Sequence, residues 1–68
     1  MYYPRLKQLR NEKKITQSKI AEFLYITQQQ YSLYENGRRE IPVNYLCKLA
    51  TLYGVSIDYL LSRTDKMT

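Results

Sequence analysis

The sequence predicts a compact all-α bundle of five short helices. Apolar residues recur at helical spacing, capping residues and glycines divide them into five segments, and no segment alternates apolar and polar residues as a strand would. The chain has 68 residues, of which 44% are hydrophobic and 25% charged, a composition typical of a folded protein. We expect one domain over residues 1–68, in which the short helices are stable only when packed together.

The first helix is expected from Pro4 to about Lys13, because proline is tolerated in the opening turn of a helix. Four of its residues fall on one stripe at helical spacing: Leu6, Leu9, Arg10 and Lys13. Thr16 is a favourable N-cap for a second helix from Gln17 to about Leu24. The inward face of this helix consists of Ile20, Ala21 and Leu24.

The third helix should follow Thr27 and end at Asn36-Gly37, since glycine readily adopts the left-handed conformation beyond a helix end. A fourth helix should begin near Pro42 and end at Gly54. Its inward stripe consists of Leu46, Leu49, Ala50 and Tyr53.

Ser56 should cap a short fifth helix from Ile57 to about Leu61, followed by a polar segment, Arg63 to Thr68, that is expected to fray. The lone cysteine, Cys47, lies within the apolar pattern of the fourth helix and is expected to be a buried free thiol.

Composition argues against several classes of function. There is no histidine, only one cysteine, no metal-ligand spacing and no glycine-rich phosphate loop, so we expect neither an enzyme nor a metal or cofactor site. No apolar run approaches membrane-spanning length, and no signal peptide is evident. A soluble, cytoplasmic protein without a membrane or small-molecule partner is therefore expected.

The charge balance indicates a polyanionic partner. Eleven Lys and Arg against six Asp and Glu give a net charge of +5, which favours nucleic acid through counterion release. Arg38 and Arg39 follow the turn after the third helix, where they are suited to contact phosphates. Three lysines flank the first turn between helices and are expected to contribute general electrostatic attraction rather than specific contacts: Lys13, Lys14 and Lys19.

The second and third helices are separated only by a short link around Tyr25-Ile26, which forces a sharp crossing and predicts a helix-turn-helix over about residues 17–36. The face of the third helix opposite Tyr31 and Tyr34 is polar near its N-terminus, where Gln28 and Gln29 lie. A glutamine amide matches the N6 and N7 edge of adenine. We therefore expect the N-terminal half of the segment from Thr27 to Asn36 to enter the major groove of double-stranded DNA.

The order and spacing of several blocks resemble the phage repressor and Cro-like (Xre-type) helix-turn-helix family of bacterial regulators. The matching residues are Thr16-Gln17, Ile20-Ala21, Leu24, Ile26-Thr27-Gln28-Gln29, Tyr34-Glu35-Asn36-Gly37, Leu46, Leu49-Ala50, Tyr53-Gly54-Val55-Ser56 and Asp58-Tyr59-Leu60-Leu61. The resemblance covers essentially the whole chain. It implies a lambda-repressor-like fold, a bacterial or phage source, and binding of operator DNA as a symmetric dimer.

The resemblance also implies roles for individual residues. Base contacts would come from Gln28, Gln29, Ser32 and Leu33. Contacts to the DNA backbone would come from Gln17, Thr27, Asn36, Arg38 and Arg39. Gln17 would bond a phosphate and could also brace Gln28. No ligand other than DNA is implied.

Two positions depart from the family pattern. Tyr25 stands where the family often has glycine at a position of positive φ, and a tyrosine there would cost about 1 kcal/mol of strain. Leu33 stands where many members carry Arg, Lys or Gln, so it would pack on a thymine methyl group instead of donating a hydrogen bond.

Arg10 and Glu35 each lie on an apolar stripe, where an unpaired charge is costly. The simplest solution is that the two side chains pair and join the first helix to the end of the third, and the family resemblance supports this structural ion pair.

The interpretation that explains most of these features is a transcriptional regulator, expected to be a repressor that is associated with the nucleoid and binds a palindromic operator as a homodimer. A short apolar tail on a small bundle needs cover, so the dimer surface is expected at residues 55–61, from Val55 to Leu61. Two alternatives stay open: an antitoxin-type autoregulator with a protein partner, and a protein-interaction module that kept the fold but lost DNA binding.

Overall fold

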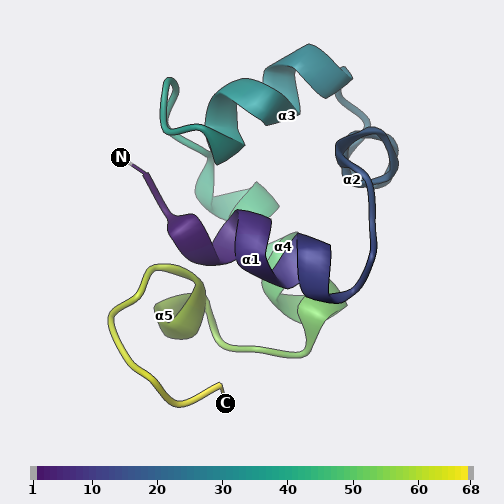
Figure 1. The fold of residues 1–68 in the computed structure, drawn as a ribbon. Coiled ribbons are helices and arrows are strands. Elements are labelled where there is room, and N and C mark those ends of the chain that lie inside the picture. The colour runs from purple at the N-terminus through teal and green to yellow at the C-terminus, as the bar shows by residue number, and fades with distance from the viewer. Residues whose placement is uncertain (1, 68) are drawn as a thin grey trace.

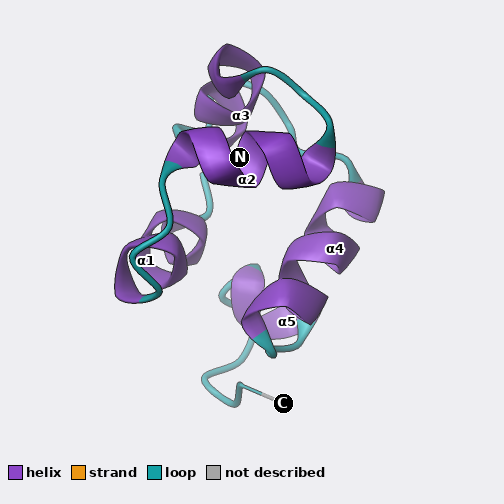
Figure 2. Cartoon of the chain, turned by 90° about the vertical axis from the view of Figure 1, so that its right-hand side faces the viewer, coloured by secondary structure: helices purple, strands orange, loops and turns teal. Residues whose placement is uncertain are grey.

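The computed structural model describes residues 2–67, which form five helices and no strand (Figure 1). In chain order these are α1 (Pro4–Glu12), α2 (Gln17–Leu24), α3 (Gln28–Glu35), α4 (Val43–Tyr53) and α5 (Ile57–Leu60). Figure 2 shows that loops alone join them. The all-α five-helix bundle expected from the sequence is therefore confirmed. None of the helices described is long and apolar enough to cross a membrane.

Three helices begin at a hydroxyl side chain, as their sequences predict. The Oγ atoms of Thr16, Thr27 and Ser56 accept hydrogen bonds from backbone N–H groups one turn into α2, α3 and α5. At α3 the arrangement is reciprocal, since the Gln30 side chain accepts from the backbone N–H of Thr27 at 3.3 Å. Each such cap satisfies a donor that the helix itself cannot, which stabilises the domain by about 1 kcal/mol.

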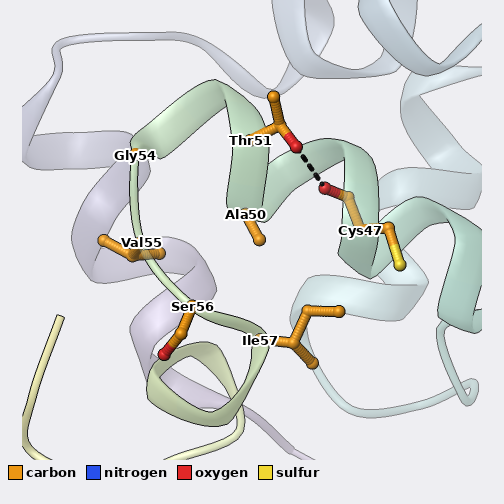
Figure 3. Close-up of a pocket in the computed structure, with 7 residues that line it drawn as sticks. All are labelled: Cys47, Ala50, Thr51, Gly54, Val55, Ser56 and Ile57. Carbon is orange, nitrogen blue, oxygen red and sulfur yellow. Dashed lines mark hydrogen bonds between the residues drawn. The ribbon is translucent and has the colours of Figure 1, made fainter. Parts of the chain in front are cut away.

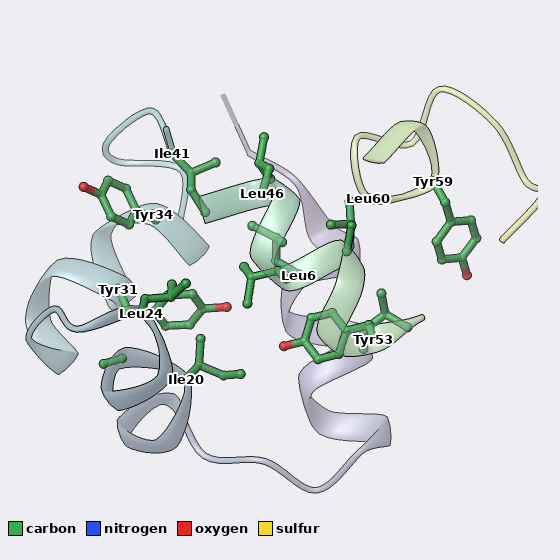
Figure 4. Close-up of a cluster of buried hydrophobic side chains, with 14 residues drawn as sticks. Leu6, Ile20, Leu24, Tyr31, Tyr34, Ile41, Leu46, Tyr53, Tyr59 and Leu60 are labelled. Carbon is green, nitrogen blue, oxygen red and sulfur yellow. The ribbon is translucent and has the colours of Figure 1, made fainter. Parts of the chain in front are cut away.

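The core is one cluster to which all five helices and the segment before α4 contribute (Figure 4). Its most deeply buried side chains include Leu6 of α1, Tyr31 of α3, Leu49 of α4 and Leu60 of α5. The cluster as a whole consists of Leu6, Leu9, Ile20, Ala21, Leu24, Tyr31, Tyr34, Ile41, Leu46, Leu49, Ala50, Tyr53, Tyr59 and Leu60. Short helices that bury so few residues each depend on this shared packing for their stability.

Several turns have left-handed backbone, and two of them are informative. Gly37, after α3, has φ +76°, and a Cβ atom there would lie 2.8 Å from Cβ of Tyr2, so both conformation and space demand glycine. Tyr25, between α2 and α3, has φ 59° and ψ 41°, with 91% of the residue exposed. The positive φ expected at this position is thus present on a bulky residue that has little packing to compensate its strain.

One sequence-based expectation about the surface is wrong. Cys47 is exposed rather than buried, because the face of α4 that packs inward is the one carrying Leu46, Leu49, Ala50 and Tyr53. The first helix ends at Glu12, and Lys13 is its exposed C-cap.

The segment after α5, residues 63–67, makes several contacts with the rest of the domain; its expected fraying stays a prediction, and Thr68 lies outside the described residues. The guanidinium of Arg5 donates to the carbonyl oxygens of Tyr59 (2.8 Å) and Thr64 (2.6 Å) and to Asp65 Oδ1 (2.9 Å). It also stacks 3.9 Å from the centroid of the Tyr59 ring. We call this group of contacts the Arg5 clasp; it fastens α5 and the segment after it to α1.

Candidate nucleic-acid interface

Helices α2 and α3 form a helix-turn-helix. Only three residues separate Leu24 from Gln28, and the first, Tyr25, takes the left-handed conformation that turns the chain. The backbone N–H of Ile26 donates back to Ala21 at 3.0 Å, and the Ile26 side chain packs against the core. Figure 1 shows α2 nearly end-on while α3 runs across the view, so the two axes cross steeply.

The two faces of α3 differ in character. Tyr31, Tyr34 and Glu35 are buried, whereas Gln28 and Gln29 are exposed. The next residues along the outer face, Ser32 and Leu33, are half-buried, and the exposed Asn36 donates from Nδ2 to Ser32 Oγ at 3.2 Å. The buried face holds the helix to the bundle, which leaves its N-terminal outer face available to a ligand.

Four of the residues assigned to DNA contact meet at one place. A shallow hollow between the beginnings of α2 and α3 is lined by Gln17, Gln28, Gln29 and Ser32. These side chains carry amide and hydroxyl groups that both donate and accept hydrogen bonds, which suits the edges of bases. We call this feature the glutamine hollow.

Apart from Gln17 of α2, the residues expected to contact phosphates lie at the two ends of α3. Thr27 Oγ1 already accepts from Gln30 N at 3.1 Å, so its hydroxyl hydrogen remains available to an outside acceptor. At the other end, Arg38 and Arg39 have exposed side chains, while both backbone N–H groups donate to the Leu33 carbonyl oxygen. The arginines thus project from a turn that is fastened to α3.

The expected pairing of Arg10 with Glu35 is present and is bidentate. Arg10 Nε lies 2.9 Å from Glu35 Oε2, and Nη2 donates to Oε1, also at 2.9 Å. Arg10 Nη1 donates to the Ile15 carbonyl oxygen at 2.8 Å, which joins the loop after α1 to the pair. The Glu35 side chain is fully buried and that of Arg10 is 11% exposed.

Burial alone would raise the pKa of Glu35, but hydrogen bonds from its neighbours, led by Arg10, outweigh this effect and hold the pKa below its ordinary value. The hydrogen bond to Glu35 likewise raises the pKa of Arg10, against the effect of burial. Both groups are therefore charged at neutral pH.

One contact was missed in the sequence. The amide nitrogen of Gln17 donates to Glu35 Oε1 at 3.3 Å, so a residue assigned to DNA contact is attached to the buried pair. A carboxylate in the core needs several donors, and Arg10 alone does not supply them all. The need for further donors indicated that another polar residue should contact Glu35, but it did not indicate which residue.

The fold and this arrangement define the class of protein: the chain belongs to the helix-turn-helix family, which matches residues 6–60. The family resemblance stated from the sequence is thereby confirmed, and so is the expectation of a domain that is not an enzyme.

Curated relatives cover nearly all of the chain. The uncharacterized HTH-type transcriptional regulator YobD of Bacillus subtilis (strain 168) is 43% identical over 65 residues, which are 96% of this chain and 58% of YobD. The SPbeta prophage-derived regulator YonR of the same organism is 44% identical over 64 residues, 94% of this chain and 59% of YonR. The HTH-type transcriptional regulator ImmR, also from B. subtilis, is 41% identical over 61 residues, 90% of this chain and 48% of ImmR.

The chain thus spans about half the length of these relatives. No match was found among the solved structures.

Proposed function

We propose that this domain binds double-stranded DNA in a sequence-specific manner and serves a transcriptional regulator, with α3 as the recognition helix. The observation that carries the proposal is the division of α3, whose inner face is buried while Gln28 and Gln29 stand exposed at its N-terminal end. A recognition helix enters the major groove by these first residues. The net charge of +5 and the regulator relatives support the same function.

We assign the contacts as follows. Gln28 and Gln29 contact base edges, and Ser32 and Leu33 lie next along the groove. Thr27, Asn36, Arg38 and Arg39 contact phosphates, as does the beginning of α2 at Gln17. The exposure of these side chains supports the assignment for all but three, since Gln17, Ser32 and Leu33 are half-buried and reach outward by part of their surface.

Selection of bound sequences from random duplex DNA tests the function, with substitutions separating the two kinds of contact. Gln28→Ala should relax the preference at one base pair, because the residue reads a base edge. Arg38→Ala should weaken binding to all sequences alike and reduce the salt slope by about one, because the residue neutralises a phosphate. Loss of affinity without a change of preference in Gln28→Ala would refute base reading by Gln28.

We further propose that the domain acts as a repressor and binds as a homodimer to a palindromic site. Two recognition helices related by a two-fold axis would lie about 34 Å apart, one turn of DNA. A selected site without two-fold symmetry would contradict this arrangement.

The dimer surface that the sequence predicts at residues 55–61 has to be revised, because part of it is buried. Within residues 55–61, Tyr59 and Leu60 are already covered by the chain itself, being 8% and 0% exposed. What stays open beside them is an apolar groove between α4 and α5 (Figure 3), and we place the dimer contact there. It is lined by Cys47, Ala50, Thr51, Gly54, Val55, Ser56 and Ile57.

Sedimentation equilibrium of Cys47→Glu tests this placement. Because Cys47 is exposed and lines the groove, a carboxylate there should shift a dimer toward monomer, whereas Lys48→Glu on the exposed side of the same helix should not. An unchanged dimer in Cys47→Glu would exclude the groove as the contact.

A further inference from the structure

The contact between Gln17 and Glu35 joins two parts of the molecule with different roles. Gln17 lines the glutamine hollow on the outside, and Glu35 is a fully buried partner of Arg10 on the inside. Both Arg10 Nη2 and Gln17 Nε2 donate to the same atom, Glu35 Oε1, at 2.9 and 3.3 Å. The buried ion pair therefore extends by one hydrogen bond to the surface of the proposed DNA interface.

The chemistry of the contact fixes which way the Gln17 amide faces. An ionised carboxylate only accepts hydrogen bonds, so the amide nitrogen must face Glu35 and the carbonyl oxygen must face elsewhere. Glu35 is ionised because its hydrogen bonds, led by that from Arg10, overcome the effect of burial and keep its pKa below the ordinary value. Gln17 lines the same hollow as Gln28, and the carbonyl oxygen, which is not used by Glu35, is an acceptor.

Several hydrogen bonds hold the anchor itself. Arg10 holds both oxygens of Glu35 and also donates to the Ile15 carbonyl oxygen, and Glu35 is on the last turn of α3. An amide tied to this unit loses little further freedom when DNA arrives, whereas a free surface glutamine has to be ordered at that moment. Gln28 and Gln29 are exposed, whereas Gln17 and Ser32 are the members of the hollow that hydrogen bonds hold in place.

We propose that Glu35, held by Arg10, is a positioning residue for DNA recognition, because it orients the Gln17 amide so that its carbonyl oxygen limits the arrangements open to Gln28. This rests on the proposed function. The buried pair thereby contributes to sequence preference as well as to stability, although neither of its members touches DNA.

The decisive variant replaces the pair without leaving a buried charge. Arg10→Met combined with Glu35→Leu keeps the volume apolar, an exchange that proteins often tolerate without loss of stability. Gln17→Leu removes the amide directly. Leu60→Val on α5 is the control, since it loosens the core without touching this network.

The readout is the ratio of affinities for the selected site and for the same site with the Gln28-dependent base pair exchanged. We expect the double variant and Gln17→Leu each to lower this ratio, on the order of tenfold, without altering the salt slope. The triple variant should lower it no further, because both changes act through one amide. Leu60→Val should leave the ratio unchanged.

Unchanged discrimination in the double variant would overturn the proposal, as would additive losses in the triple variant. If the double variant does not fold, Gln17→Glu takes its place: its carboxylate repels Glu35 and cannot donate, so the ratio should fall likewise, and an unchanged ratio would again overturn the proposal.

The free protein supplies an independent measurement that separates this inference from the proposed function. The side-chain NH₂ signals of Gln17 should be as well ordered as the backbone in the wild type and mobile in the double variant. Ordered signals in both would refute the anchoring by Glu35 even if DNA binding is sequence-specific. Absence of salt-sensitive binding to duplex DNA by the wild type would instead refute the function on which the proposal rests.

Discussion

Among the described residues, three that are not glycine hold the left-handed conformation: Lys14, Tyr25 and Ser62. Each lies just after a helix, where the chain leaves the helix and turns. Tyr25 is the most informative of them, because its ring is almost wholly exposed and returns little packing energy. The sharp turn between α2 and α3 therefore places conformational strain on the backbone of Tyr25.

Tyr25→Gly should raise the free energy of unfolding by roughly 0.5–1 kcal/mol, because glycine adopts positive φ without steric strain, although the more flexible unfolded chain offsets part of the gain. Urea denaturation measures the change. Tyr25→Ala is the matched control: it also removes the exposed ring but keeps a Cβ atom, so it should not stabilise. Equal stability of the two variants would show that Tyr25 is unstrained.

Glu35 gives the stability of the domain a definite dependence on pH. Its pKa is below the ordinary value of 4.5 in the folded state, so its contribution is fully present above that value and is lost as the pH falls through the lower folded pKa. Unfolding midpoints in urea should therefore decrease from pH 6 toward pH 3. The double variant Arg10→Met, Glu35→Leu should show a shallower decrease, and an identical slope would show that Glu35 does not cause the pH dependence.

At the scale of elements, the beginning of α3 combines a structural and a functional requirement. The reciprocal bonds between Thr27 and Gln30 hold the first turn, and that turn carries Gln28 and Gln29. With only eight residues, α3 cannot stay formed by its own propensity at an end that is exposed. The cap therefore orders the residues proposed to read bases.

Thr27→Ala should lower the free energy of unfolding by about 1 kcal/mol, because the Gln30 backbone N–H loses its acceptor. It should also speed hydrogen exchange in the first turn of α3 more than elsewhere, as measured by NMR. Thr27→Ser keeps the hydroxyl and should change both quantities much less. Uniform acceleration of exchange over the whole domain would show that the cap does not act locally.

The helices could be predicted from the sequence where interactions between neighbouring residues determine where they begin and end. Thr16, Thr27 and Gly54 mark helix ends by interactions within a few residues, so neighbouring sequence suffices to find them. Cys47 was placed wrongly because it lies beside an apolar stripe, and the face that packs inward depends on elements distant in the chain. The link from Gln17 to Glu35 likewise depends on how α2 and α3 cross.

For the whole molecule, the Arg5 clasp connects the two ends of the chain. Arg5 contacts residues 54 to 60 positions away in sequence, among them Tyr59 and Asp65. The backbone N–H of Ser56 also donates to the Met67 carbonyl oxygen at 2.6 Å. Contacts of this range leave no periodic trace in a sequence, which is why the sequence did not indicate them. α5 is short, and these contacts hold it in place together with its buried residues Tyr59 and Leu60.

Arg5→Met should detach the segment after α5 and destabilise the domain by roughly 1–3 kcal/mol, because two carbonyl oxygens lose a charged donor. Limited proteolysis should then cut within residues 61–67 faster than in the wild type. Asp65→Asn is the control and should change little, since this side chain is fully exposed. Equal cleavage rates in Arg5→Met and the wild type would refute the clasp.

The close approach of Tyr2 to Gly37 has a practical consequence for anyone who handles this protein. The beginning of the chain lies against the turn that follows α3, next to the arginines proposed to contact phosphates (Figure 1). A purification tag or fluorescent protein fused ahead of residue 1 would crowd that side and compete with DNA for it. Binding assays should therefore use protein from which any such N-terminal fusion has been cleaved.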